Sequence, residues 1–186
     1  MVQNYTGFHG TTENAGSSIL DNGFRIKKYS FLTTAPQKVP GDLGAGVYAF
    51  KDSIHNAFKF AQKEQNNQEI SVLEVDLTVD DDKILDMDEP DNEEIFQGIM
   101  SSPVMDSLFR RFEKDTGSKR RQCLDGLIIE HIIHKHNLNV DLVLKKTYTP
   151  FKGMPKISHA PNGTEMCIKE KDIIKSIKRC KKIPPK

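Results

Sequence analysis

The stretch FHGTT, residues 8–12, decides how the rest of the chain is interpreted. It places a histidine, a glycine and two hydroxyl side chains where a short apolar segment ends. Imidazole and hydroxyl groups donate and accept hydrogen bonds, and glycine lets a ligand approach the backbone closely. The stretch suits a site that binds the polar edge of a small molecule. Taken alone, such a tripeptide is more often an ordinary turn with a satisfied histidine, so the rest of the chain has to decide.

Length and composition bound the class of protein. The chain has 186 residues, of which 37% are hydrophobic and 28% charged, as in a globular protein with one buried core. No apolar run approaches membrane-spanning length, and the polar N-terminus lacks the basic start of a signal peptide. An odd number of cysteines without a CxxC pattern favours reduced thiols. We therefore expect one domain over residues 1–186 that acts in the cytoplasm. The three cysteines are Cys123, Cys167 and Cys180.

Charge is divided unevenly along the chain. Residues 1–109 carry 8 Lys and Arg against 18 Asp and Glu, whereas residues 110–186 carry 19 against 8. Two explanations stay open. The halves fold together and neutralise one another, or the basic half presents a face to an anionic partner such as nucleic acid. For the second, Arg120 and Arg121 offer cations, and the loop residues Tyr148, Phe151 and Lys152 offer rings and a cation that could stack on a base.

Hydrophobic periodicity and turn residues predict an α+β domain. The expected strands cover 2–8, the apolar end of 41–50, 71–79, 139–147 and 165–169. The expected helices cover 11–24, 52–65 and 92–116, the last broken near Pro103. Residues 124–136 fit either a strand or a buried helix, and 172–178 fit a short helix or an edge strand. The segments 25–41 and 148–163 are predicted to be irregular.

Three of these elements carry predictions about caps and burial. A threonine hydroxyl caps the first helix and Gly23 ends it. Its expected buried residues are Ala15, Ile19 and Leu20. The strand 71–79 should bury Leu73, Val75, Leu77 and Val79 on one side. The helical region 92–116 should bury a stripe made of Val104, Leu108, Phe109 and Phe112.

Three features follow one another along the chain: a strand ending in His9-Gly10-Thr11, a glycine-rich turn leading into Tyr48, and a long loop that ends at Glu165. In this order the sequence resembles the ADP-ribosyltransferase superfamily, in the branch whose His-Tyr-Glu triad is shared by poly(ADP-ribose) polymerases and diphtheria-type toxins. FHGTT with its helix matches the H-G-[ST] opening of that family. LGAGVYAF matches its G-x-G-[IV]-Y-F turn and strand.

The resemblance implies a split β-sheet core with flanking helices and NAD as the substrate. The implied activity transfers ADP-ribose to a macromolecule and releases nicotinamide through an oxocarbenium-like sugar. Gly10 would bind the nicotinamide carboxamide, His9 a hydroxyl of the adenosine ribose, and Thr11 would be a nearby polar contact. Tyr48 would stack on the nicotinamide ring. Glu165 would accept a hydrogen bond from the 2′-hydroxyl and stabilise the cation.

The sequence departs from the family pattern at several positions. Lys59 stands where the polymerase branch commonly has a second stacking tyrosine, and Phe60 is the substitute that we expect. Asn56 falls where that branch has a serine that binds the carboxamide, and it would play a similar part. Gly163, two residues before Glu165, replaces the Gln or Glu of arginine-modifying relatives and argues against transfer to arginine.

Other assignments stay open or are disfavoured. Glu130 with His131, His134 and His136 suggests a metal site, but no HExxH motif is present and a solvated helix face explains the cluster, so we expect no metal. The acceptor is a protein side chain, an RNA or DNA base, or water. Water would make the protein an NAD glycohydrolase, and a module that binds NAD or ADP-ribose without turnover is the third alternative. A small chain of this kind suits a toxin or effector.

Overall fold

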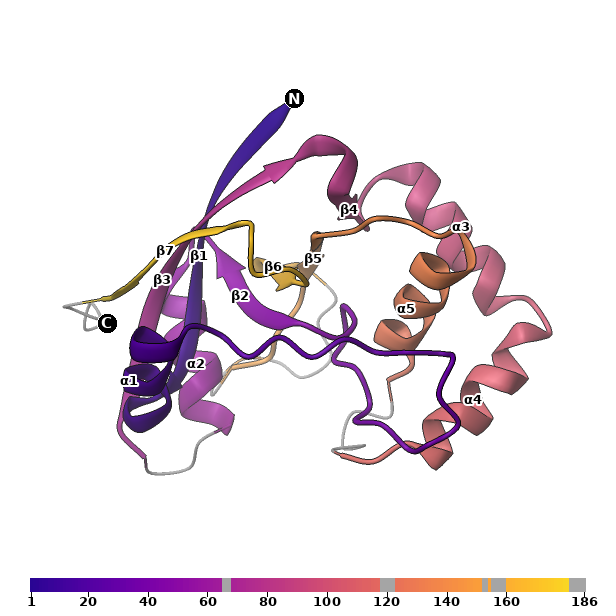
Figure 1. Ribbon diagram of the computed structural model, residues 1–186, viewed down its shortest axis with the longest axis horizontal. Helices are drawn as coiled ribbons and strands as arrows, with labels where there is room; N and C mark the ends of the chain where they lie inside the picture. The colour runs from indigo at the N-terminus through magenta and orange to yellow at the C-terminus, as the bar shows by residue number, and fades with distance from the viewer. Residues whose placement is uncertain (65–67, 118–122, 152–153, 155–159, 181–186) are drawn as a thin grey trace.

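The computed structural model describes residues 1–64, 68–117, 123–151, 154 and 160–180. Within these ranges the protein is a mixed α+β structure built on one seven-stranded sheet (Figure 1). Its strands are β1 (Val2–Thr12), β2 (Val47–Lys51), β3 (Ile70–Asp80), β4 (Ile84–Asp86), β5 (Leu142–Thr147), β6 (Gly163–Ile168) and β7 (Ile174–Arg179). Its α-helices are α1 (Glu13–Asn22), α2 (Ile54–Glu64), α3 (Pro90–Met100), α4 (Val104–Lys114) and α5 (Asp125–Lys135). None of these helices has the length and apolar character needed to cross a membrane.

The sheet has the strand order β4-β5-β6-β2-β1-β3-β7, and its neighbours are antiparallel except for β4 and β5. β1 pairs with β3 along its whole length, from Val2 to Thr12. With β2 it pairs at only two positions, Gly7 with Lys51 and Phe8 with Phe50. The two parts of the sheet are therefore joined by a short ladder, which ends before His9.

The helices divide between the two ends of the sheet (Figure 1). α1 and α2 pack on β1 and β3, whereas α3, α4 and α5 pack on one another beside β4 and β5. One hydrophobic cluster, centred on β3 and β6, contacts α1, a second fills the space between the sheet and α3–α5, and a third packs α2 against β1, β2 and β3. Phe8 and Phe50, the last described pair of the β1–β2 ladder, belong to the third cluster.

Most elements lie where the sequence predicts them. The Thr12 hydroxyl accepts a hydrogen bond from Ala15 N (3.3 Å) and caps α1, and Gly23 ends it with a φ of 71°. The alternation in β3 is confirmed, because its predicted inward residues are at most 1% exposed. Residues 125–135 form a helix, which resolves the ambiguity there. β7 is the edge strand beside β3.

Three predictions of detail are wrong. The first strand continues to Thr12, because β3 pairs with it throughout, so His9 lies inside the strand and not at its end. Leu20 is exposed, since α1 covers the sheet with the face that contains the buried Gly16. Phe109 is 50% exposed, because α4 turns Leu108 and Phe112 towards the core instead.

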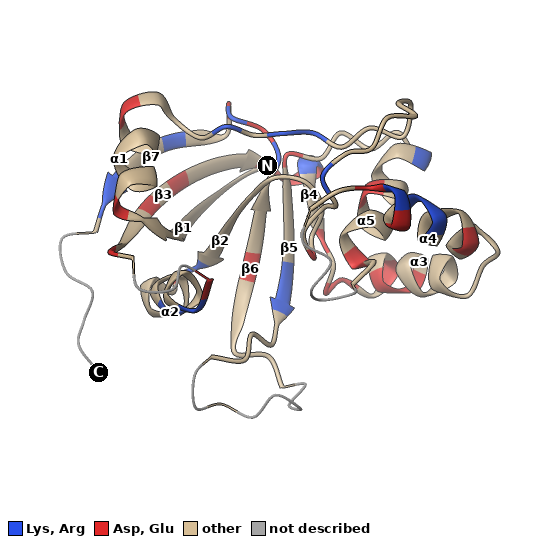
Figure 2. Cartoon of the chain, turned by 90° about the horizontal axis from the view of Figure 1, so that it is seen from below, with Lys and Arg blue, Asp and Glu red and all other residues tan. Residues whose placement is uncertain are grey.

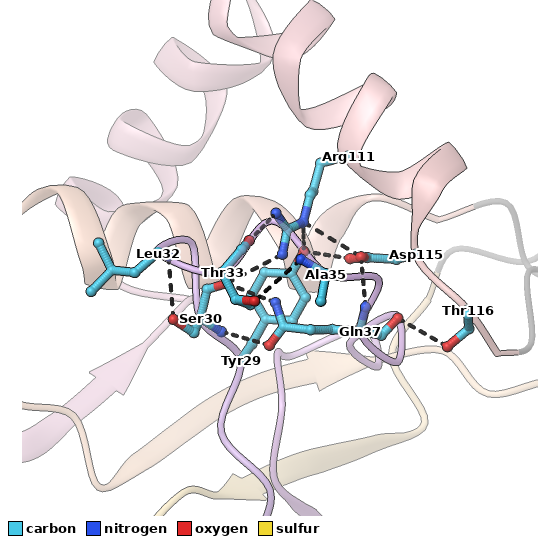
Figure 3. Close-up of polar contacts among 9 residues, drawn as sticks. All are labelled: Tyr29, Ser30, Leu32, Thr33, Ala35, Gln37, Arg111, Asp115 and Thr116. Atoms are coloured by element: carbon cyan, nitrogen blue, oxygen red, sulfur yellow. Dashed lines mark hydrogen bonds and ion pairs between the residues drawn. The ribbon is translucent and has the colours of Figure 1, made fainter.

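Although residues 25–41 contain neither helix nor named strand, a polar network fixes them to α4 (Figure 3). Arg111 donates to the Tyr29 hydroxyl (Nε to Oη, 2.8 Å) and to the Thr33 carbonyl (Nη1 to O, 2.7 Å). The buried carboxylate of Asp115 accepts hydrogen bonds from Gln37 N (3.0 Å) and from the Tyr29 hydroxyl. Burial, followed by the bond to Asp115, raises the pKa of Tyr29 far above 10. The segment is therefore held by buried charge.

Acidic and basic residues from the two halves of the sequence meet in the fold. Basic residues of β7 lie beside acidic residues of β3 (Figure 2). Lys178 Nζ lies 3.1 Å from Asp76 Oδ2, and Arg179 pairs with Glu13. These pairs support mutual neutralisation of the halves. Arg120 and Arg121 lie outside the described residues.

Candidate active site

A small cavity of about 50 Å³ lies where β1 and β2 separate. Its walls come from β1, β2, α2 and β6, four elements that are distant in sequence. The described lining residues are Phe8, His9, Gly10, Tyr48, Ala49, Phe50, Ala57, Phe60 and Glu165. Five of the residues singled out from the sequence therefore meet at one place: His9, Gly10, Tyr48, Phe60 and Glu165.

The His9 imidazole bridges the two strands. Its Nδ1 lies 2.7 Å from the Tyr48 carbonyl oxygen, and because a carbonyl only accepts, Nδ1 carries the proton. Burial lowers the pKa of His9 below its ordinary value of 6.5, and the bond to Tyr48 opposes this only in part. The ring also packs edge-on against Phe24, with 5.1 Å between centroids. His9 is thus held in the neutral form, with Nε2 as a hydrogen-bond acceptor.

Gly10 is required by the packing of α2. A Cβ at this position would lie 2.0 Å from the carbonyl oxygen of Ala57 and 2.9 Å from the Cβ of Ala61. The helix therefore crosses β1 directly over Gly10. The sequence suggested that Gly10 lacks a side chain so that a ligand can approach. On this face of the strand, the space beside Gly10 is occupied by the backbone of α2.

By the register of the β1–β2 ladder, the N–H and C=O of Gly10 are directed within the plane of the sheet towards β2. Thr6 O accepts a hydrogen bond from Asp52 N (3.1 Å), and Phe8 pairs with Phe50 in the same register. Alternate residues of a strand direct their N–H and C=O to the same neighbour. Continuing the register would pair Gly10 with Tyr48, but the described ladder ends at Phe8, and the Tyr48 carbonyl receives His9 instead.

Hydrogen bonds to its hydroxyl and packing of its ring fix the side chain of Tyr48. Its hydroxyl accepts from Leu43 N (2.8 Å) and donates to Gly44 O (2.8 Å), and its ring packs against the cluster that contains Cys167. Burial raises the pKa of Tyr48 well above its usual value of 10. The ring is therefore a rigid wall of the cavity, anchored to the glycine-rich turn.

Glu165 lies inside β6, opposite Phe50 of β2, and is 7% exposed. Its Oε1 accepts hydrogen bonds from the hydroxyls of Thr147 (2.9 Å) and Thr149 (2.8 Å). Buried carboxylates are costly unless hydrogen-bond donors surround them. Two hydroxyls on one oxygen stabilise this carboxylate beside the aromatic walls of the cavity.

Of the remaining predicted contacts, one lines the cavity and two are not among its described lining residues. Phe60, the expected substitute for a second stacking tyrosine, lines the cavity. The ammonium of Lys59 lies over the ring of Phe151, 5.5 Å from its centroid. Thr11 pairs with Ser71 of β3 and is not among the described lining residues. Asn56 is also absent from that lining, because its Nδ2 donates to Asn162 O (2.9 Å).

Sequence reasoning missed two pairs of residues at the site. Phe8 and Phe50 line the cavity, and both lie two residues from a predicted contact, on the same side of their strands as Gly10 and Tyr48. Thr147 and Thr149 bind Glu165. The alternation within the two recognised motifs would have found the phenylalanines, whereas the threonines belong to a segment without a motif.

Of the residues Tyr148, Phe151 and Lys152, which the sequence suggests for stacking on a base, Phe151 lies in the core. Phe151 is 5% exposed and packs against Phe50, with 6.4 Å between ring centroids. Its ring is therefore part of the core beneath the cavity, and the prediction that it could stack on a base is wrong. Lys152 lies outside the described residues.

Glu130, a member of the candidate metal cluster on α5, has a structural role. In the described part of the chain no group of His, Cys, Asp and Glu has an arrangement that could hold a metal ion. His134 and His136 are exposed, but Glu130 is 7% exposed and binds both Lys169 Nζ (2.5 Å) and Ala45 N (2.6 Å) through Oε1. Glu130 therefore does not belong to a solvated helix face.

The three cysteines are free thiols. Burial raises the pKa of Cys167 to about 12 and that of Cys123 to about 11, so neither is a thiolate at neutral pH.

Comparisons of the chain with protein-family models, with curated proteins and with solved structures gave no match. The site is therefore interpreted from its own geometry.

Proposed function

We propose that the protein is an NAD-dependent ADP-ribosyltransferase that transfers ADP-ribose to a macromolecular acceptor and releases nicotinamide. The observation that carries this proposal is the meeting of His9, Gly10, Tyr48 and Glu165 around one cavity, although they come from three separate strands. The short β1–β2 ladder supports a split sheet of the kind that the sequence resemblance implies.

The chemistry of the cavity suits the pyridinium of NAD. Rings of Phe8, Tyr48, Phe50 and Phe60 line it, and the carboxylate of Glu165 is the acidic group among the described lining residues. Aromatic faces and a desolvated carboxylate both attract a flat organic cation. A pyridinium ring needs more room than about 50 Å³, so binding requires a wall to shift; Phe60 on α2 is half-buried and is the wall that we expect to move.

Polar groups at the cavity complete the proposed site. The N–H and C=O of Gly10 face β2 beyond the end of the ladder, where a carboxamide would bind both. Neutral His9 offers Nε2 as the acceptor for a ribose hydroxyl. Glu165 would accept a hydrogen bond from the 2′-hydroxyl of the nicotinamide ribose and stabilise the cationic sugar as the glycosidic bond breaks.

We propose a protein side chain as the acceptor. Ion pairs between the two halves of the sequence use part of the basic charge, and Phe151 is buried. Both findings weaken the argument for a nucleic-acid acceptor that the sequence raised. A role as a toxin or effector remains part of the same proposal.

The test is incubation of the protein with NAD labelled in its adenylate part and with whole lysate. Label should enter macromolecules, survive nuclease and be lost with protease, while free nicotinamide appears. Glu165→Gln should lower nicotinamide release by about 100-fold or more while NAD binding survives, because the carboxylate acts in the transition state. Glu74→Gln, on β3 outside the cavity, is the matched control and should be normal.

The other outcomes identify the alternatives. Free ADP-ribose without labelled macromolecules would make the protein an NAD glycohydrolase. NAD binding without release of nicotinamide would make it a binding module, and label that is lost with nuclease would identify a nucleic-acid acceptor. Wild-type turnover in Glu165→Gln would contradict the assigned role of Glu165.

A further inference from the structure

Two threonines, one at the end of β5 and one two residues beyond it, direct their hydroxyls to a single oxygen. Thr147 Oγ1 and Thr149 Oγ1 donate to Oε1 of Glu165 at 2.9 and 2.8 Å. Thr147 pairs with Gly163 of β6, and this pairing brings the two threonines beside Glu165. Thr149 is 5% exposed. The hydroxyl of Thr149 therefore acts on the carboxylate in a largely water-free environment, while Thr147 is half-buried.

Thr149 is itself held by Asn162. Asn162 Nδ2 donates to Thr149 O (2.8 Å), and Thr149 N donates to Asn162 Oδ1 (3.0 Å), so the amide side chain pairs with Thr149 as a strand backbone would. Asn162 N also donates to Thr147 O (2.9 Å). The base of the loop between the two strands is thereby closed.

A residue of α2 completes the chain of contacts. Asn56 Nδ2 donates to Asn162 O at 2.9 Å. The neighbouring Gly163 makes this approach possible, because a Cβ there would lie 2.5 Å from Asn56 Nδ2. A continuous series of hydrogen bonds thus leads from Asn56 through Asn162 and Thr149 to Glu165.

We propose that Thr147 and Thr149 are positioning residues that fix the Glu165 carboxylate with Oε2 directed to the cavity, and that Asn162 and Asn56 hold Thr149 for this task. The inference rests on the proposed function of Glu165. A free glutamate side chain samples several rotamers, and two hydrogen bonds to one oxygen restrict it to one orientation before substrate arrives. Asn56 then acts on the reaction through Thr149, without contact with nicotinamide.

The experiment measures nicotinamide release by Thr149→Val and Thr149→Ser. Valine keeps the shape and removes the hydroxyl, so kcat should fall by about 10- to 100-fold, the value of a hydrogen bond to a charged group, with the KM for NAD changed by less than about twofold. Serine restores the hydroxyl and should restore kcat. Thr78→Val is the matched control, since its hydroxyl binds Asn4 on another part of the sheet (2.9 Å).

Thr147→Val provides a second variant at a half-buried position if Thr149→Val does not fold. A double-mutant cycle between Thr149→Val and Glu165→Met, read by urea unfolding, tests the contact without activity. A coupling between the two changes supports the contact, and strict additivity would overturn it. Absence of nicotinamide release from the wild type would overturn the proposed function and the inference with it. Wild-type release combined with normal kcat in both valine variants would overturn the inference alone.

Discussion

The imidazole Nδ1 of His9 lies 2.7 Å from the carbonyl oxygen of Tyr48, at the point where the β1–β2 ladder ends. In a continued antiparallel ladder that carbonyl would face Gly10. The side chain of His9 therefore occupies the hydrogen-bonding position of its neighbour's backbone. In the proposed function this leaves the Gly10 backbone for the substrate.

The burial of His9 predicts a dependence of stability on pH. Its folded-state pKa lies below the ordinary value of 6.5, so at mildly acid pH the unfolded chain binds more protons than the folded one. The free energy of unfolding should therefore fall as the pH drops from 6.5 towards the folded-state pKa. Burial lowers the pKa of His131 as well, so both contribute.

Urea unfolding at several pH values checks this dependence. The free energy of unfolding of His9→Gln should vary less with pH between 7 and 5 than that of the wild type. This is the range in which an unperturbed histidine begins to bind its proton. The double variant with His131→Gln should flatten the curve further. An identical pH dependence in wild type and His9→Gln would show that His9 titrates normally in the folded protein.

Gly10→Ala should destabilise the fold through α2. The new Cβ would lie 2.0 Å from a backbone oxygen, which cannot rotate away, so the helix must shift at a cost of about 1–3 kcal/mol. Gly98→Ala in α3 is the matched control. Its Cβ would meet nothing within 4 Å, and removing a helical glycine should stabilise by about 0.5–1 kcal/mol. Thermal unfolding measures both, and equal stability of the two variants would contradict the packing over Gly10.

Tyr48→Phe should lower the free energy of unfolding by more than a conservative substitution usually does. Loss of the hydroxyl leaves Leu43 N without its acceptor in a buried turn, at a cost of about 1–3 kcal/mol. NAD affinity should still be retained if the ring stays in place. Tyr5→Phe on β1 is the control, with an expected change within about 0.5 kcal/mol, and urea unfolding decides between them.

The elements of the fold could be predicted because local signals agree with the tertiary structure. The alternation in β3 and the Thr12 and Gly23 caps are examples. The length of β1 could not be predicted, since it depends on pairing with β3, a long-range interaction. At the candidate site, motifs indicated His9, Gly10 and Tyr48, but Thr147 and Thr149 act through contacts that only the pairing of β5 with β6 creates.

The buried ion pair between Glu130 and Lys169 fixes the glycine-rich turn that anchors Tyr48. Glu130 Oε1 accepts from Ala45 N (2.6 Å), and Lys169 Nζ donates to Ala45 O (3.0 Å), so the pair binds both sides of one residue. The approach requires Gly44, whose φ is 98° and whose Cβ would lie 2.5 Å from Glu130 Oε1. The turn is therefore held by charge from α5 and from the end of β6.

Removing one partner of this pair should be more damaging than removing both. Lys169→Met leaves the Glu130 carboxylate buried without its counter-charge and should cost about 3–5 kcal/mol. The double variant Glu130→Met with Lys169→Met removes both charges and should recover part of that loss. Lys28→Met, which breaks the exposed pair with Glu170, is the control and should cost at most about 1 kcal/mol. Urea unfolding of the wild type, Glu130→Met, Lys169→Met, the double variant and Lys28→Met measures these differences. If the double variant is less stable than Lys169→Met by the full cost of Glu130→Met alone, the two charges are independent. That result would contradict the conclusion that the ion pair holds the glycine-rich turn.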